Sequence, residues 1–186
     1  MKRLSIRRAT ESDAALLHTW DERPHVMAAT SNDGSRSFDA DWEEELKPRR
    51  DGTEFFIAEA DGMPIGAMQI IDPATEETRY WGDVASDLRA IDIWIGEESF
   101  IGRGYGTRMM RFAIDRCFSS AAVDAILIDP LANNVRSHTF YRRLGFEFVE
   151  RRQFDSDSDC LVFRLDREVW SARRGDEDAV PDPASR

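Results

Sequence analysis

The sequence predicts one mixed α/β domain built around a single β-sheet, and three observations carry this prediction. The chain has 186 residues, which is the length of one domain. Apolar residues make up 41% of it and charged residues 33%, so it can bury a full core and is not disordered throughout. The predicted elements run as a strand, helices, three strands, a helix, a strand, a helix and two strands, an order that is typical of a mixed α/β domain.

Seven segments show the alternation or the short continuous apolar run that is typical of strands. They are residues 4–9, 54–59, 65–71, 89–95, 125–129, 146–154 and 160–165. Four segments have helix-capping residue types or apolar residues at helical spacing, namely residues 10–20, 38–48, 104–118 and 134–144. Pro24 is expected to end the first helix, and residues 24–38 and 72–88 are expected to be loops. The domain is expected over residues 1–170, with the polar segment 171–186 as a disordered tail.

The sequence argues against a membrane protein, a secreted protein and a metal-binding protein. No window approaches the roughly 20 apolar residues of a membrane-spanning helix, and the N-terminus lacks the apolar core of a secretory signal. Cys117 and Cys160 are too far apart in sequence for a paired-cysteine zinc site, so a cytoplasmic protein is expected. The three histidines share no metal-ligand spacing, and Asp155–Asp159 lacks the glycine and distal Glu of a calcium loop, so no metal is expected.

The chain is acidic, with 36 Asp and Glu against 25 Lys and Arg and a net charge of −11. That balance argues against a protein that grips nucleic acid through its phosphates. Residues 72–98 hold eight acidic residues against two arginines, a net of −6, so more than half of the net charge lies in one stretch. We expect this stretch either to attract a cationic substrate, with Asp83 and Asp87 as candidate contacts, or to be solvated loop charge.

Three glycines, Gly102, Gly104 and Gly106, stand between a predicted strand and a predicted helix. The first N–H groups of a helix lack acceptors, and the helix dipole is positive there. Glycines let a phosphate approach those amides, so this cluster, with Arg103 and Thr107 beside it, suits a pyrophosphate. The dinucleotide fingerprint and the nucleotide-triphosphate loop both fail to match, because Thr107 replaces a glycine and Gly-Lys-Ser/Thr is absent. A glycine-rich turn without a ligand is the alternative.

A second motif follows the predicted interior strand, with the pattern Asn-x-Arg…Tyr…Gly-Phe. Its residues are Asn134, Arg136, Tyr141, Gly145 and Phe146. The glycine cluster and this motif together resemble the two cofactor motifs of the GCN5-related N-acetyltransferases, which move an acetyl group from acetyl-coenzyme A to an amine. The resemblance covers residues 4–168. It departs at Ile101, where the family often has Gln or Arg; backbone amides do most of the phosphate binding, so the match is weakened only slightly.

The resemblance implies a single mixed, mostly antiparallel central sheet flanked by helices, with acetyl-coenzyme A as the acetyl donor. It also implies that the pyrophosphate lies on the amides of residues 102–107 and the pantetheine arm along residues 92–95. The residues that it implies for cofactor binding are Ile93, Trp94, Ile95, Gly102, Arg103, Gly104, Tyr105, Gly106, Thr107, Asn134 and Arg136.

Within the family, the chain looks most like the aminoglycoside 6'-N-acetyltransferases. The stretches that carry this likeness are Tyr80-Trp81, Arg89-Ala-Ile-Asp92, the glycine cluster and Asp129-Pro130…Asn134. Asp92 falls where those enzymes place an acidic residue facing the substrate amine. An aminoglycoside-type 6'-amine, acetylated by direct transfer in a ternary complex, is the acceptor that this likeness implies, with Trp81, Asp83, Asp87 and Asp92 on the substrate side.

The reaction assigns a role to each polar candidate. An alkylammonium, whose pKa is about 10, must lose a proton before it can attack a thioester, and Asp92 is the candidate base. The amides of Trp94 and Ile95 are candidates to polarise the thioester carbonyl, as an oxyanion hole does. Tyr141 resembles the general acid that the family uses to protonate the leaving thiolate.

Each role has a structural alternative. Asp92 could pair with Arg89 or Arg111, Tyr141 could be a core aromatic, and Trp81 and Trp94 could be core residues rather than substrate platforms. Cys117 lies on the apolar face of its helix, which favours a core residue over a nucleophile.

The acceptor has alternatives as well. A siderophore precursor with an amine or hydroxylamine is one, and a protein amine is another. A non-catalytic acyl-coenzyme A-binding module is the alternative from a different class. The expected partner is a small cationic amine, with no nucleic acid and no membrane, and the protein is expected to be a monomer or homodimer.

Overall fold

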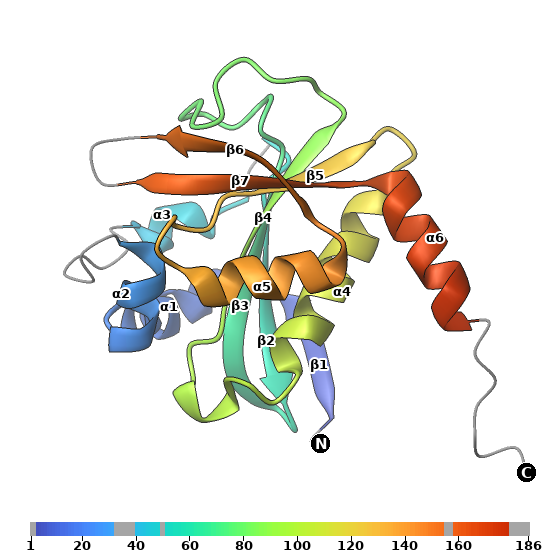
Figure 1. The fold of residues 1–186 in the computed structure, drawn as a ribbon. Helices are drawn as coiled ribbons and strands as arrows, with labels where there is room; N and C mark the ends of the chain where they lie inside the picture. The colour runs from blue at the N-terminus through green and yellow to red at the C-terminus, as the bar shows by residue number, and fades with distance from the viewer. Residues whose placement is uncertain (1–2, 32–39, 49–50, 155–157, 179–186) are drawn as a thin grey trace, which may run out of the picture.

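Seven strands form one sheet in the order β1-β2-β3-β4-β5-β7-β6 (Figure 1). The computed structural model describes residues 3–31, 40–48, 51–154 and 158–178. The strands are β1 (Leu4–Arg8), β2 (Glu54–Ala60), β3 (Met63–Ile71), β4 (Leu88–Trp94), β5 (Ala125–Ile128), β6 (Glu147–Gln153) and β7 (Asp159–Asp166). Every neighbouring pair is antiparallel except β4 and β5. The prediction of one mixed, mostly antiparallel sheet flanked by helices is therefore confirmed.

β4 leaves β5 after a short shared ladder. Paired residues run from Leu88 and Ala125 to Ala90 and Leu127, whereas the ladder between β3 and β4 continues to Trp94. In the described chain, the second half of β4 is thus paired with β3 alone. Parting strands leave backbone N–H and C=O groups without a strand partner, and such groups are available to an extended ligand.

Helices cover both faces of the sheet. They are α1 (Ala14–Asp21), α2 (Pro24–Thr30), α3 (Trp42–Glu45), α4 (Tyr105–Phe118), α5 (Val135–Leu144) and α6 (Arg167–Asp178), with 3₁₀ turns η1 (Glu11–Asp13) and η2 (Glu98–Phe100). Because strand side chains alternate, each strand contributes to two cores. Buried residues of α4 and α5 pack on one face, and those of α1 and α3 pack on the other. A third cluster, on the face of α1, contains Trp81, Leu88, Ala90, Ala125, Leu127 and Val162.

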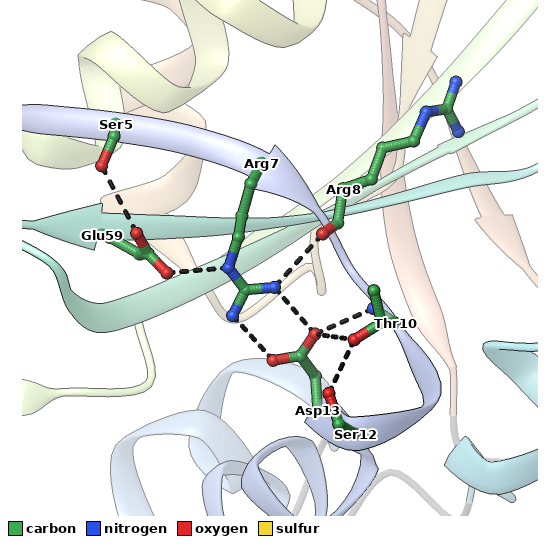
Figure 2. A network of polar contacts seen from close by, with 7 residues as sticks. All are labelled: Ser5, Arg7, Arg8, Thr10, Ser12, Asp13 and Glu59. Carbon is green, nitrogen blue, oxygen red and sulfur yellow. Dashed lines mark hydrogen bonds and ion pairs between the residues drawn. The ribbon is translucent and has the colours of Figure 1, made fainter.

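A charged network ties β1 and β2 to the start of α1 (Figure 2). The Arg7 guanidinium donates to both carboxylate oxygens of Asp13 at 2.8 Å and to Glu59 Oε1 at 2.7 Å. Asp13 Oδ2 also accepts from Thr10 N at 2.8 Å, which closes the first turn. Asp13 is buried, and the hydrogen bonds from Arg7 hold its pKa below the usual range. The network fixes the direction in which α1 leaves the sheet.

Two segments expected to lack regular structure are helical. Residues 24–30 form α2, because Pro24 stands at its first position, where a fixed φ and a missing N–H suit a helix start. Residues 171–178, expected in the disordered tail, belong to α6, which is anchored by a hydrogen bond of 3.0 Å from Trp170 Nε1 to Asp115. The helix expected over 38–48 is shorter, and the loop expected over 72–88 is confirmed as far as β4.

Some expectations concern residues outside the described ranges. These are the start of the second helix at 38–39, the last part of the loop at 24–38, the segment 155–157 of the calcium-like loop, and residues 179–186 of the tail. No helix in the described ranges is long and apolar enough to cross a membrane.

Candidate active site

Asp92 and Asp129 occupy matching positions on the two strands that part. Continuing the β4–β5 register two residues beyond Ala90 and Leu127 brings Asp92 opposite Asp129. Ala90 and Leu127 belong to the cluster on the face of α1, and a strand returns to the same face after two residues. Both carboxyl groups therefore lie on that face, at the point where the sheet opens.

The two carboxyl groups influence each other's protonation. Asp92 is exposed to solvent, yet desolvation by the surrounding protein and then the charge of Asp129 raise its pKa to about 7. The exposure of Asp92 and its raised pKa are both explained by a carboxylate that protein surrounds on most sides and that solvent reaches from one side. Within the described residues the Asp92 carboxylate has no ion pair or hydrogen bond, and Arg89 pairs instead with Asp72 at 3.1 Å. A carboxyl group that changes charge near neutral pH without a structural partner is suited to acid–base chemistry.

Aromatic side chains border Asp129. Tyr80 Oη donates to Asp129 Oδ2 at 2.6 Å, and the Tyr80 ring stacks on Phe154 with centroids 4.2 Å apart. Tyr80 is 40% exposed, whereas Trp81 is 4% exposed and packs edge-on against both of these rings. Trp81 is therefore a core residue, which favours the structural alternative, and its contact with the substrate stays a prediction. The exposed aromatic surface beside the carboxyl groups belongs to Tyr80.

Tyr141 approaches the same region from α5, on the opposite face of the sheet. Its ring packs against Phe140 and Phe146, and it is 8% exposed. Burial, followed by the charges of Asp92 and Asp129, raises the pKa of Tyr141, so its hydroxyl is protonated at neutral pH. No described residue shares a hydrogen bond with that hydroxyl. Tyr141 is thus a core aromatic residue, and its protonated hydroxyl lies near both aspartates.

The glycine cluster forms a helix start that no described side chain caps. α4 begins after Gly104, which has φ +81°, and Gly102 has φ +74°, a backbone that favours glycine. The first turn contains no acidic residue, although acids are favourable there. The first backbone bond described for this helix runs from Arg108 N to Gly104 O at 3.3 Å, so the preceding amides point beyond the helix end. The pyrophosphate of acetyl-coenzyme A fits such a cradle.

The two predicted cofactor motifs meet in space. A Cβ on Gly102 would lie 3.8 Å from Arg136 Nη2, so the Arg136 guanidinium stands beside the glycine cluster. Arg103 is exposed at the same turn, whereas Tyr105 is buried against Phe100 and can offer a ligand only its backbone amide. Asn134 caps α5, since its Oδ1 accepts from Ser137 N at 3.1 Å. Arg136 therefore adds positive charge where an anion would bind.

The end of β4 connects the glycine cluster to Asp92. Ile93, Trp94 and Ile95 are half-buried, and Ile95 O accepts a hydrogen bond of 2.9 Å from His25 of α2. Trp94 packs against Trp42 on the face of α1, and its Nε1 is buried without a partner among the described residues. A Cβ on Gly106 would lie 3.7 Å from Ile95 Cδ1, so the helix start borders the strand end. An extended ligand could run from one to the other.

Asp83 and Asp87 are two further residues predicted to contact the substrate. Asp83 is fully exposed, with Arg79 Nη1 at 3.7 Å. Asp87 precedes β4 and lies five residues from Asp92, about 16 Å along an extended strand. Its backbone oxygen accepts from Asp124 N at 2.7 Å, which holds the start of β5 against β4. The structure therefore does not bring Asp87 to the Asp92–Asp129 pair.

The two site residues absent from the predicted set are Asp129 and Tyr80. The sequence pattern that indicates Asp129 is its position directly after a short, continuously apolar strand. Polar residues just past the carboxyl end of an interior strand commonly line ligand-binding sites. Tyr80 carried a weaker signal, as an aromatic residue within an acidic loop.

The chain matches the acetyltransferase (GNAT) domain family over residues 9–154. The aminoglycoside N(6')-acetyltransferases type 1 of Klebsiella pneumoniae and Serratia marcescens are each 28% identical over 148 residues, covering 77% of this chain and 74% of theirs. The crystal structure of aminoglycoside acetyltransferase AAC(6')-Ib with coenzyme A and kanamycin matches with a TM-score of 0.80 at 26% identity, over 92% of this chain and 99% of that one.

These matches and the geometry define the class of protein. The chain belongs to the GNAT acetyltransferase family. It is an acetyl-coenzyme A-dependent N-acetyltransferase. The start of α4, with Arg136 beside it, has the features that suit an anion, and binding of the donor there stays a prediction. Among the described residues, no group of three or more His, Cys, Asp or Glu side chains could hold a metal ion.

Proposed function

We propose that this enzyme acetylates the 6'-amine of an aminoglycoside by direct transfer from acetyl-coenzyme A in a ternary complex. The observation that carries the proposal is the pair of carboxyl groups at the parting of β4 and β5, beside the exposed ring of Tyr80. A polycationic sugar with hydroxyl and ammonium groups complements such a surface. The names of the relatives, and the kanamycin in one neighbour's crystal structure, point the same way.

Asp92 is the base in this proposal. The bound ammonium must lose a proton before its nitrogen can attack the thioester carbonyl, and a carboxylate whose pKa is about 7 can accept that proton at neutral pH. Asp129 remains beside it as a negative charge that holds the cationic acceptor. The amides of Trp94 and Ile95, at the end of β4, are placed by the same proposal toward the carbonyl oxygen of the donor.

Tyr141 is the acid that protonates the departing thiolate. Its raised pKa keeps the proton on the hydroxyl until the sulfur becomes negative, and its position near both aspartates keeps it close to the reacting groups. Acetyl-coenzyme A supplies the activated acetyl group, and Gly102, Gly104 and Arg136 hold its phosphates in this proposal.

Direct transfer is favoured over a covalent route through cysteine. Cys117 is buried on the inner side of α4, and burial raises the pKa of its thiol to about 12, so a thiolate is scarce at neutral pH. Cys160 is also buried, in β7.

A panel of acceptors tests the proposed function. The protein is mixed with acetyl-coenzyme A and each of four acceptor types: aminoglycosides, a hydroxylamine-bearing siderophore precursor, a peptide with a free amino terminus, and no acceptor. Release of free thiol is followed over time. We expect aminoglycosides to give the highest kcat/KM. Faster turnover of the siderophore precursor or the peptide would replace the acceptor, and binding of acetyl-coenzyme A without thiol release for any amine would indicate a non-catalytic binding module.

A further inference from the structure

We infer that Tyr80 is a positioning residue that holds Asp129 in its carboxylate form, so that Asp92 is the member of the pair that takes up the proton. The inference rests on the proposed function, because it explains how one of two similar carboxyl groups becomes the base. Tyr80 acts through Asp129 and is not itself placed at the reacting atoms.

The contact between the two residues is short and well supported. Tyr80 Oη lies 2.6 Å from Asp129 Oδ2, a typical length for a hydroxyl that donates to a carboxylate. The ring is held by Phe154, parallel to within 4°, and by Trp81 at its edge. Burial and the charge of Asp129 raise the pKa of Tyr80, so the hydroxyl keeps its proton and remains a donor.

Hydrogen bonds in the turn around Tyr80 fix the position of its backbone. Glu76 accepts hydrogen bonds from Thr78 N at 2.7 Å, from Thr78 Oγ1 at 2.6 Å and from Tyr80 N. Arg79, between them, has φ +51°, which is uncommon for a residue with a side chain, and Gly82 N closes the turn on Arg79 O at 2.9 Å. Glu76 is therefore a structural acceptor in this turn.

No described residue donates a hydrogen bond to the Asp92 carboxylate, and this difference distinguishes Asp92 from Asp129. The titratable and charged groups of this region are Tyr80 in the loop before β4, Asp92 in β4, Tyr141 in α5, Arg152 in β6 and Cys160 in β7. The charge of Asp129 raises the pKa of Asp92, Tyr80 and Tyr141, and the charge of Cys160 adds to the rise at Tyr80. Burial raises the pKa of Asp129, and the hydrogen bond from Tyr80 is the largest of the effects that oppose this rise, with the charge of Arg152 a smaller one. Two neighbouring carboxyl groups resist a double negative charge, so the proton goes to the member that lacks a donor, Asp92.

Titration of the free protein tests this directly. Carboxyl carbons are labelled with carbon-13 in Asp, and the signals are assigned with D92N and D129N. In the native protein we expect Asp129 to titrate below Asp92. In Y80F, which keeps the ring and removes the donor, we expect the pKa of Asp129 to rise by about one, because a carboxylate loses a hydrogen bond that favours its charge. An Asp129 titration that is the same in both proteins would overturn the inference.

Kinetics give an independent reading. Y80F is expected to raise KM for a cationic acceptor several-fold at pH 6, because loss of the donor shifts Asp129 toward its protonated form. The rise should be much smaller at pH 8.5, because a higher pH favours the carboxylate in both proteins. F154L, which changes the packing of the ring and leaves the hydroxyl, serves as the comparison. An equal rise in KM at both pH values for Y80F, matched by F154L, would mean that Tyr80 acts by packing alone.

The two tests separate this inference from the proposed function. The carbon-13 titration needs no acceptor, so it decides the action of Tyr80 on Asp129 even if aminoglycosides are not acetylated. Conversely, rapid acetylation of aminoglycosides with an unchanged Asp129 titration in Y80F would remove the inference and leave the proposed function in place.

Discussion

Asp92 owes its candidate role to its position on β4 and to a carboxylate that has no hydrogen bond or ion pair among the described residues. It is one of 36 acidic residues in the chain, and its residue type alone carries no information. It stands two residues past the last paired position of β4 and β5, opposite a second carboxyl group. Desolvation at that point moves its titration from the acidic range to about pH 7, where a base for an ammonium is useful.

Replacing Asp92 by Asn should lower kcat by about 10²-fold or more, because the shape is kept while the proton acceptor is lost. In the native enzyme, kcat/KM should rise as pH increases through about 7, since the raised pKa leaves Asp92 protonated and inactive below that value. Steady-state kinetics from pH 5.5 to 8.5 measure both effects. D83N is the matched control, because Asp83 is fully exposed. If D92N retains native kcat, Asp92 is not the base.

Replacing Tyr141 by Phe should lower kcat by about 10²–10⁴-fold, with a much smaller effect on the affinity for acetyl-coenzyme A. The ring and its contacts with Phe140 and Phe146 remain, so the loss isolates the hydroxyl. Single-turnover kinetics and calorimetric titration with coenzyme A separate the two quantities. An unchanged rate of the chemical step would assign Tyr141 to the core alone.

At the scale of elements, the parting of β4 from β5 and the open start of α4 make the site. The strand end supplies backbone groups and Asp92, and the helix end supplies unpaired amides next to Arg136. The left-handed backbone at Gly102 and Gly104 lets the chain turn tightly from one to the other.

Gly104→Ala should weaken acetyl-coenzyme A binding about tenfold or more, because a Cβ would stand where the pyrophosphate approaches the amides. It should also destabilise the fold by about 1–2 kcal/mol, since φ is +81° there. Gly62→Ala provides the control: Gly62 has φ +80°, has open space for a Cβ, and turns the hairpin between β2 and β3. Calorimetric titration should show native affinity for the control only. Equal affinities in the two variants would place the pyrophosphate elsewhere.

The charged network of Arg7, Asp13 and Glu59 at the start of α1 should contribute to the stability of the fold. Asp13→Asn should lower the free energy of unfolding at pH 7 by about 1–2 kcal/mol, a moderate value because Arg7 is 40% exposed and solvent screens the pair. The pKa of Asp13 is lowered in the folded state, so its stabilisation is full above about pH 4 and is lost as pH falls through the lower, folded value. Urea unfolding should show a smaller difference in the free energy of unfolding between this variant and the native protein at pH 2.5 than at pH 7. Ser5→Ala is the control, because Ser5 lies at the edge of the network (Figure 2), and its stability should be near native at both pH values.

Across the whole molecule, the sequence predicts most of the sheet, because alternation and short apolar runs reflect burial on one or both faces. Pro24 follows the end of α1, as the sequence predicts, but it also begins α2, because proline suits the first position of a helix. The parting of β4 and β5 could not be predicted, because it depends on which strands pair and for how long. The position of Asp129 opposite Asp92 depends on that pairing, and the burial of Trp81 depends on its packing against β4, β5 and β7, so neither could be derived from local patterns.

The central claim, acetyl transfer to the 6'-amine of an aminoglycoside, is tested most directly with two acceptors that differ only at that position. One carries an amine at 6' and the other a hydroxyl, and each is incubated with the protein and acetyl-coenzyme A. We expect thiol release with the first acceptor only, and one new acetamide that nuclear magnetic resonance locates at the 6' nitrogen. Equal turnover of both acceptors, or an acetyl group at any other nitrogen, would contradict the claim.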